Sequence, residues 1–427
     1  MAEKPKTLTI RAYQVGFGDC FLLTFHYPMS ERHVLIDFGT RSLPKGLKDP
    51  DKHMRRVADD VKARCKGKLQ AVVATHRHQD HISGFATAAD GKGSGDVIAA
   101  CKPSVVVQPW TEHPDAARNA TRAPLTKTLL AMHEFAAGTV ADVKRMRGVA
   151  SAIRDELRFT GENNISNPSA VKNLMTMGPN RYVNAGSVLN LDKLLPGVKV
   201  HVLGPPTLEQ SSSIRKEART HPEFWKLQKQ LASARQAFWR LQVHSAQAGR
   251  RRRKLFPNAP RAGNPIHARW LRRQLHDVRG ENLLEIVRIL DAAMNNTSVI
   301  LLLEAGSKRL LFPGDAQIEN WAYALAQKKY AKLLEDVHVY KVGHHGSTNA
   351  TPRINLWEKF KHRSDHPSPK RMLSLLSTLH GVYPGKSKET AVPQATLVKA
   401  LEAKTEYFST ETLGGSKLYS DILIPLT

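Results

Sequence analysis

Three histidines and an aspartate within six consecutive positions set the strongest constraint on how this chain can fold. His76, His78, Asp80 and His81 follow directly after the apolar segment LQAVVA. That segment predicts a buried strand, and residues two apart in a strand share a face, so His76 and His78 can reach one point. If the chain then turns into a helix, Asp80 and His81 project toward a second, adjacent point. Because a buried polar group without a partner costs several kcal/mol, this pattern predicts two neighbouring metal sites at a strand end.

The residue types indicate which ions such sites would hold. Imidazole and carboxylate groups suit zinc, manganese or iron. Two ions about 3.5–4 Å apart can lower the pKa of a shared water and stabilise an anionic transition state. We therefore expect two divalent metal ions as cofactors, with zinc or manganese favoured.

Length and composition bound the fold and the location. The chain has 427 residues, of which 41% are hydrophobic, enough for one large α/β domain with insertions or for two domains. No segment approaches the roughly 18 apolar residues of a membrane span, and the start MAEKPKTLTI lacks the apolar region of a secretion signal. Cys20, Cys65 and Cys101 are too few and too widely spaced for a disulfide framework. These features predict a cytoplasmic protein without a membrane span.

Strand-like and helix-like segments alternate along the chain, which predicts an α/β fold. Strand-like segments lie at residues 7–15, 20–27, 33–39, 69–74, 104–110, 198–204, 337–342, 372–379 and 421–426, and residues 297–315 read as a hairpin that turns at EAGSK. Helical spacing occurs at residues 55–65, 321–335 and within 120–180.

A basic segment interrupts this pattern. Residues 211–280 hold 17 Arg and Lys against three acidic residues, which is +14 of the net charge of +26. Apolar residues at helical spacing flank the segment AGRRRRKLFPNAPRAGNP, so we expect an inserted helical hairpin with a basic tip. The most basic residues of that tip are Arg250, Arg251, Arg252, Arg253 and Lys254. A polyanion such as nucleic acid is one partner that this charge favours, and a well-solvated surface is the alternative.

Several motifs resemble one protein family. THRHQDH resembles the HxHxDH signature of the metallo-β-lactamase superfamily. The segments YQVGFGDCFLLTF, HVLIDFG, NNTSVILLLEAGSKRLLFPGDAQIENW and VYKVGHHGSTNATP are similar, in order, to the soluble hydrolase domain of ComEC-type DNA-uptake proteins and their stand-alone relatives. The resemblance covers roughly residues 8–110, 195–206 and 295–425 and leaves out the basic insertion.

The resemblance implies an αββα sandwich, in which two mixed sheets carry helices on the outside and metal ions at one rim. His76, His78, Asp80 and His81 would be metal ligands, and Asp315 would bridge the two ions, although a helix N-cap is the alternative for Asp315.

Further site residues follow from the same resemblance. Of the GHHGS pair, His344 is favoured as a ligand, which leaves His345 to contact the substrate or hold the pocket, although the spacing does not separate the two. Asp37 matches an aspartate that orients the metal-binding loop by hydrogen bonding. Asp19 either lies close to the metals or caps backbone amides in a turn. Many relatives carry a further histidine after the strand VHVLGPP; this chain does not, and His201 within that strand is expected to be structural. The number of bound ions therefore stays open.

Together these features predict a metallo-β-lactamase-like domain formed by residues 1–206 and 295–427, with a basic insertion at 207–294 near the active-site mouth. The expected activity is that of a metal-dependent phosphodiesterase, most simply a nuclease that acts on DNA or RNA. Asp80 would help to orient the attacking water, and His345 would stabilise the phosphate or protonate the leaving oxygen. One alternative is a metallo-hydrolase of a small substrate, such as a phosphoryl ester, cyclic nucleotide, thioester or lactam, whose insertion serves docking. Another is a nucleic-acid-binding module with a vestigial pocket.

Overall fold

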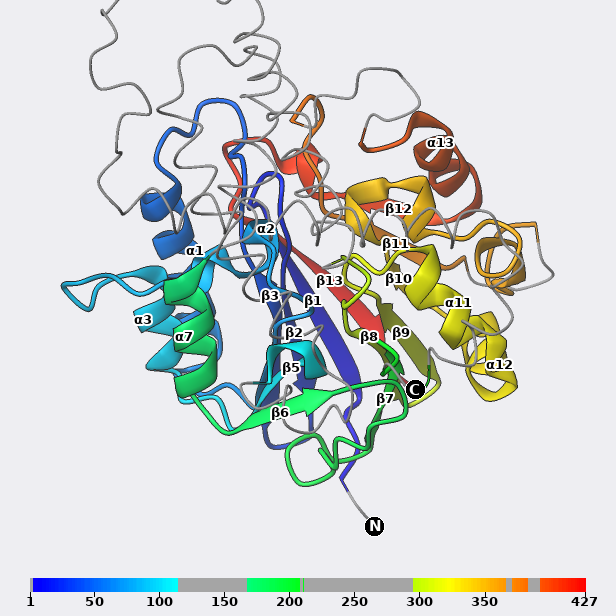
Figure 1. The fold of residues 1–427 in the computed structure, drawn as a ribbon, viewed down its shortest axis with the longest axis horizontal. Coiled ribbons are helices and arrows are strands. Elements are labelled where there is room, and N and C mark those ends of the chain that lie inside the picture. Colours follow the sequence, from blue (N-terminus) through cyan, green and yellow to red (C-terminus); the bar gives the residue numbers. More distant parts are fainter. Residues whose placement is uncertain (1–2, 114–166, 208–209, 211–294, 366–370, 383–391) are drawn as a thin grey trace, which may run out of the picture. The chain divides into compact units, whose positions relative to one another are not determined.

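The computed structural model describes residues 3–113, 167–207, 210, 295–365, 371–382 and 392–427. The chain divides into two units, and all of these residues belong to the first, which comprises Met1–Thr121, Asn167–Ser212 and Met294–Thr427. This unit contains two mixed β-sheets and several helices (Figure 1).

The first sheet has seven strands and joins an antiparallel half to a parallel half. β13, β1, β2 and β3 pair antiparallel, whereas β3, β4, β5 and β6 pair parallel. In spatial order the strands are β13 (Tyr419–Pro425), β1 (Thr7–Tyr13), β2 (Cys20–His26), β3 (Glu31–Phe38), β4 (Ala71–Val73), β5 (Val106–Pro109) and β6 (Asn180–Val183).

The second sheet has six strands and the same division. β12, β11, β10 and β9 pair parallel, whereas β9, β8 and β7 pair antiparallel. In spatial order the strands are β12 (Glu406–Ser409), β11 (Leu373–Leu376), β10 (Val339–Lys341), β9 (Lys308–Phe312), β8 (Ile300–Ala305) and β7 (Val198–Gly204).

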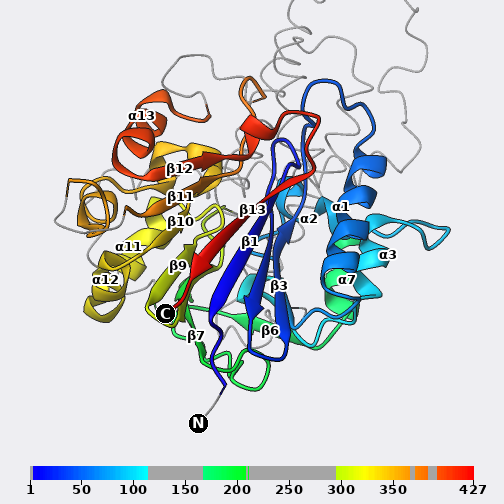
Figure 2. The same ribbon diagram turned by 180° about the vertical axis from the view of Figure 1, so that it is seen from behind.

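The helices cover the outer faces of the two sheets, as the opposite views of Figures 1 and 2 show. One core of buried apolar side chains draws on both sheets, one lies between the first sheet and its helices, and one between the second sheet and its helices. The first sheet carries α1 (Pro50–Arg64), α3 (Ser94–Ala99) and α7 (Pro168–Thr176), and the second carries α11 (Ile318–Ala326), α12 (Lys328–Glu335) and α13 (Ala395–Lys404).

Helix α1 shows how local sequence sets these elements. Asp49 accepts a hydrogen bond from the backbone N–H of Lys52 at 2.9 Å, and Pro50 occupies the first turn, where its missing N–H costs nothing. Met54, Val57 and Val61 recur at helical spacing and are buried against the first sheet.

The structure confirms the predicted α/β class, the strands named from the sequence and the 297–315 hairpin, in which Gly306 turns with φ 56°. The predicted helix at 321–335 is instead two helices, because Gln327 adopts an extended conformation between α11 and α12. Cys20, Cys65 and Cys101 are free and buried. Among the helices described, none is long and apolar enough to cross a membrane. In the predicted helical segment 120–180, residues 167–180 are described and include α7, and residues 120–166 lie outside the described ranges. The predicted basic insertion 207–294 also lies outside them, apart from residues 207 and 210.

Parallel pairing brings the segments with the predicted site residues to one edge of each sheet. β3 and β4 run side by side and end at Phe38 and Val73, so the loops that follow them leave the first sheet together. In the second sheet β9 and β10 likewise end side by side, at Phe312 and Lys341. The carboxyl ends of neighbouring parallel strands are where functional loops gather.

The contact between the two sheets can be tested at Phe312, which packs edge-on against Phe21 of the first sheet with ring centroids 5.9 Å apart. We expect Phe312→Ala to lower the free energy of unfolding by about 3–5 kcal/mol, because both rings lie in the fully buried shared core. Urea denaturation followed by circular dichroism measures the change. Leu423→Ala, at a side chain 66% exposed on β13, is the control and should cost less than about 1 kcal/mol.

Candidate metal centre

The segment that carries the predicted ligands leaves β4 at Val73 and enters the short helix α2 (Gln79–Ile82). His78 is still extended, with φ −60° and ψ 150°, so the chain changes from extended to helical just before Asp80. His76, His78, Asp80 and His81 are all buried, none with more than 4% of its surface exposed. The expected passage from a strand end into a helix is therefore present, with His76 and His78 in the loop between the two elements.

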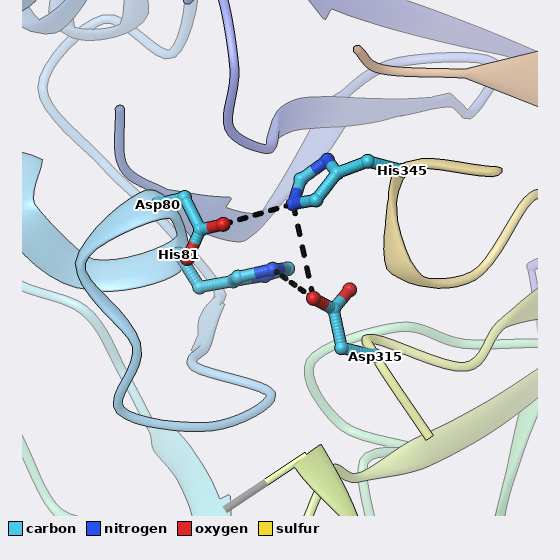
Figure 3. Close-up of side chains that lie close together, drawn as sticks. All are labelled: Asp80, His81, Asp315 and His345. Carbon is cyan, nitrogen blue, oxygen red and sulfur yellow. Dashed lines mark hydrogen bonds and ion pairs between the residues drawn. The ribbon is translucent and has the colours of Figure 1, made fainter. Parts of the chain in front are cut away.

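Side chains from both sheets converge on this segment. Figure 3 shows Asp80 and His81 facing Asp315 and His345. His81 Nε2 lies 3.1 Å from Asp315 Oδ2, and His345 Nε2 lies 3.0 Å from Asp80 Oδ2 and 3.7 Å from Asp315 Oδ2. We call these four residues, together with His76 and His78, the centre.

His76 and His78 form the second part of the centre. His76 Nε2 lies 3.0 Å from His78 Nδ1 and 3.9 Å from Asp315 Oδ2. One oxygen of Asp315 is therefore within 4 Å of three imidazoles, those of His76, His81 and His345. A carboxylate in that position can be shared between two adjacent cations.

Backbone geometry places Asp315 at the rim after β9. Gly314 has φ 56°, and a Cβ there would lie 2.8 Å from the Thr75 side chain, so only glycine fits. The alternative of a helix cap is wrong, because α11 begins at Ile318 with Gln317 as its N-cap. The carboxylate of Asp315 faces the centre instead.

The two histidines of GHHGS lie in different surroundings. His345, not His344, enters the centre: its Nδ1 bonds the Ser377 carbonyl at 2.9 Å, which turns Nε2 toward Asp80. His344 is half-buried, and its backbone N–H donates to Asp315 Oδ1 at 3.1 Å. The pair separates because both residues adopt left-handed conformations, with φ 44° and 50°, which send the two rings in different directions.

Asp37 makes the orienting contacts expected of it. It accepts hydrogen bonds at 2.7 Å from both the backbone N–H and the hydroxyl of Thr75, and its Oδ2 lies 2.8 Å from His81 Nδ1. With Nδ1 held in this way, the other ring nitrogen of His81 faces Asp315. A carboxylate behind a histidine is the usual device that fixes a metal-binding imidazole.

Lys341 is a residue of this region that sequence reasoning missed. It is the last residue of β10, only 2% exposed, and its ammonium pairs with Asp19 and lies 3.8 Å from Asp315 Oδ1. The signal was available, since a lysine inside the apolar segment VHVYKV is an unusual strand residue. Burial lowers the pKa of Lys341, but Asp19 and Asp315 more than offset this and raise it above its ordinary value.

Asp19 itself lies in the predicted tight turn GFGD, which packs against α2. Its backbone N–H donates to the Asp80 carbonyl at 2.9 Å. A Cβ on Gly18 would lie 2.3 Å from the Gly39 carbonyl oxygen, so the turn can approach this closely only with glycine. Of the two alternatives for Asp19, the structure places its side chain beside the centre.

The charges of the centre fit divalent cations. Asp19, Asp37, Asp80 and Asp315 are each at least 96% buried. Burial lowers the pKa of His81 and His345, yet the neighbouring carboxylates, Asp315 first, outweigh it and raise both. Among the hydrogen bonds of the described residues, Oδ1 of Asp19 and Oδ1 of Asp80 have no partner. A buried carboxylate oxygen without a donor is costly, and a bound cation would supply the missing interaction.

A second cluster of metal-binding residue types has a different character. His362 Nε2 lies 2.7 Å from Asp336 Oδ1, and His338 stacks on His362 with ring centroids 4.0 Å apart. The side chain of Arg309 pairs with Asp336, and its backbone N–H donates to His338 Nδ1 at 3.3 Å. These interactions already use the carboxylate of Asp336 and one nitrogen of each imidazole, so we interpret the cluster as a structural network.

Two other predicted positions lie away from the centre. His201 bonds Glu304 on the neighbouring strand β8 at 2.5 Å, which agrees with the structural role expected for it. The basic tip Arg250, Arg251, Arg252, Arg253 and Lys254 falls outside the described residues.

Asp37 offers a test of the geometry. Asp37→Asn replaces one of the two accepting oxygens by an –NH2 group, which cannot accept a hydrogen bond from His81 or Thr75. We expect the affinity for Zn²⁺ or Mn²⁺ to fall about 10–100-fold, the usual effect of losing such a partner. Competition with a chelator of known affinity measures it. Asp421→Asn, at an aspartate paired with Arg11 on β1, is the matched control. Equal affinities for the wild type and Asp37→Asn would contradict this role.

The centre thus combines four histidines with two carboxylates, and Asp315 stands between its two parts. Asp37 orients His81 from behind, and Lys341 and Asp19 lie alongside. Comparison of the sequence with protein-family models and with curated proteins finds no match.

Proposed function

We propose that this protein is a metal-dependent phosphodiesterase, most simply a nuclease that acts on DNA or RNA. One observation carries the proposal: Asp80 and His81 meet Asp315 and His345 in a single buried cluster, and His76 lies 3.9 Å from Asp315 Oδ2 beside it. Such convergence of distant segments is difficult to explain as packing, because burying these carboxylates and imidazoles gains little without a bound ion.

We further propose that the fold is that of the metallo-β-lactamase superfamily, as in the ComEC-like branch that the motifs resemble. Support comes from two mixed sheets that share a core, helices on both outer faces, and a centre at the rim where β4, β9 and β10 end. The THRHQDH segment, Asp315 and GHHGS lie at the strand ends that this resemblance implies.

Two divalent ions bound in the centre would activate a water molecule and offset the negative charge of a phosphodiester. The chain's own residues then have distinct tasks. His76 and His78 with Asp315 would hold one ion, and Asp80, His81 and His345 with Asp315 the other. Asp80 Oδ1, which lacks a hydrogen-bond donor among the described residues, would accept a hydrogen bond from the attacking water and so orient it.

The position of His345 among the clustered side chains changes one assignment. His345 is fully buried and directed at two carboxylates, which suits a ligand and leaves it no access to a leaving group. His344 is half-buried, next to the Asp315 loop, and is the better candidate for contacting the phosphate. Its ring is near the Gln317 amide, at 3.5 Å.

The substrate class follows from charge. A net charge of +26, with +14 in residues 211–280, favours a polyanion over a small neutral ester. Successive phosphates of a nucleic acid would bind such a surface with strong dependence on salt.

The activity is tested with labelled single- and double-stranded DNA and RNA in the presence of Mn²⁺, Zn²⁺ or Mg²⁺. We expect cleavage that chelation by EDTA abolishes, and a fall of at least about a hundredfold in His76→Ala/Asp80→Ala, because losing two ligands exceeds the loss of an outer partner. The matched control is His362→Ala/Asp336→Ala, which removes the same residue types from the structural network and should retain cleavage. Undiminished cleavage by the first variant would exclude the centre as the source of activity.

Salt dependence distinguishes a polynucleotide from a small substrate. If the protein contacts six to ten phosphates, its affinity for a polynucleotide should fall about 10³–10⁵-fold between 50 and 200 mM salt. Fluorescence anisotropy with a labelled oligonucleotide in EDTA measures binding without cleavage. A shallow dependence together with weak affinity would favour a small phosphoryl ester as the substrate.

A further inference from the structure

The ion pair between Lys341 and Asp19 connects the two sheets beneath the centre. Val339 and Lys341 lie two residues apart on β10 and so point to the same face, and Val339 belongs to the core that the sheets share. The Lys341 side chain therefore points from the second sheet into the space between the sheets. Asp19 approaches from the other side, one residue before β2 of the first sheet.

The surroundings of this lysine are unusual for a charge that serves stability alone. A buried ion pair contributes little net stability, because desolvation of both groups offsets their attraction. Lys341 also lies 3.8 Å from Oδ1 of Asp315, the oxygen that accepts from the His344 backbone at 3.1 Å. Oδ1 is thus held from two directions, while Oδ2 faces the three imidazoles.

We propose that Lys341 is a positioning residue of the centre: with the His344 amide it holds Oδ1 of Asp315, so that Oδ2 is presented to both cation positions. The inference rests on the proposed function, because it presumes that Asp315 is shared between bound ions. Asp19 has the supporting task of keeping the ammonium in place, while its backbone N–H holds the carbonyl of Asp80 on the other side of the centre.

A double substitution that leaves the net charge unchanged separates the positioning of Asp315 by Lys341 from a general effect of charge on cation binding. Asp19→Asn/Lys341→Met removes one negative and one positive charge, so the net charge near the cations is unchanged. Neutral replacement of a buried pair is often tolerated, so the fold should survive. We expect a urea midpoint near that of the wild type and an affinity for Zn²⁺ or Mn²⁺ lower by about tenfold or more. Chelator competition and elemental analysis of bound metal are the readouts.

Two further variants make the result decisive. Asp365→Asn/Lys404→Met removes a remote pair of the same residue types, 2.8 Å apart and partly exposed, and should keep wild-type metal affinity. If the methionine variant fails to fold, Asp19→Asn/Lys341→Gln, which keeps a hydrogen-bond donor at residue 341, takes its place with the same expected loss.

The outcomes distinguish this inference from the proposed function. A folded Asp19→Asn/Lys341→Met protein that binds Zn²⁺ and Mn²⁺ as tightly as the wild type would overturn the positioning role and leave the metal centre standing. A wild-type protein that binds neither ion would overturn both. A selective loss of affinity, with the fold and the remote control intact, supports the role proposed for Lys341.

Discussion

The electrostatic repulsion among four buried carboxylates is the constraint on which this structure depends. Asp19, Asp37, Asp80 and Asp315 gather at one rim, where the surrounding protein screens charge far less than water does. Among the described residues, ion pairs with His81, His345 and Lys341 compensate part of that negative charge. Within the same part of the chain, Oδ1 of Asp19 and Oδ1 of Asp80 still lack a hydrogen-bond partner, and the proposed cations would compensate their charge.

Because the centre draws on both sheets, its geometry and the packing of the sheets depend on each other. Asp80 and His81 belong to the first sheet through the loop after β4, and Asp315 and His345 to the second through the loops after β9 and β10. The shared core, with contacts such as Phe21 on Phe312, sets the spacing between the sheets and hence the separation of the two sets of side chains. Lys341 and Asp19 connect them at the rim itself.

The sequence predicted most of the strands and the segments whose side chains cluster, because the underlying signals are local. Apolar periodicity indicates the strands, and the closely spaced histidines after β4 can be recognised without knowing the rest of the chain. It did not separate His344 from His345, since that choice depends on two consecutive left-handed residues and on the Ser377 carbonyl thirty-two residues away. Nor did it identify Lys341, whose partner Asp19 lies in the turn directly before β2 of the other sheet.

Short or weakly patterned elements were missed for a related reason. β6 (NRYV) and β12 (EYFS) are edge strands in which only the last residue is buried, so their sequences lack a strong apolar pattern. Their positions are set by pairing with β5 and β11, which no local signal encodes. The break between α11 and α12 at Gln327 likewise has no glycine or proline to announce it.

The pairing of β7 with β8 bears on how such a protein can diversify. These strands are antiparallel neighbours, and Gly204 at the end of β7 pairs with Ile300 at the start of β8, although some ninety-five residues separate them along the chain. Loop-closure entropy grows slowly with length, by only about 0.6 kcal/mol for each doubling. A lineage could therefore lengthen, shorten or exchange this connection at small cost to the pairing of β7 with β8, even though it joins the sheet beside the end of β9, where Leu301 pairs with Phe312.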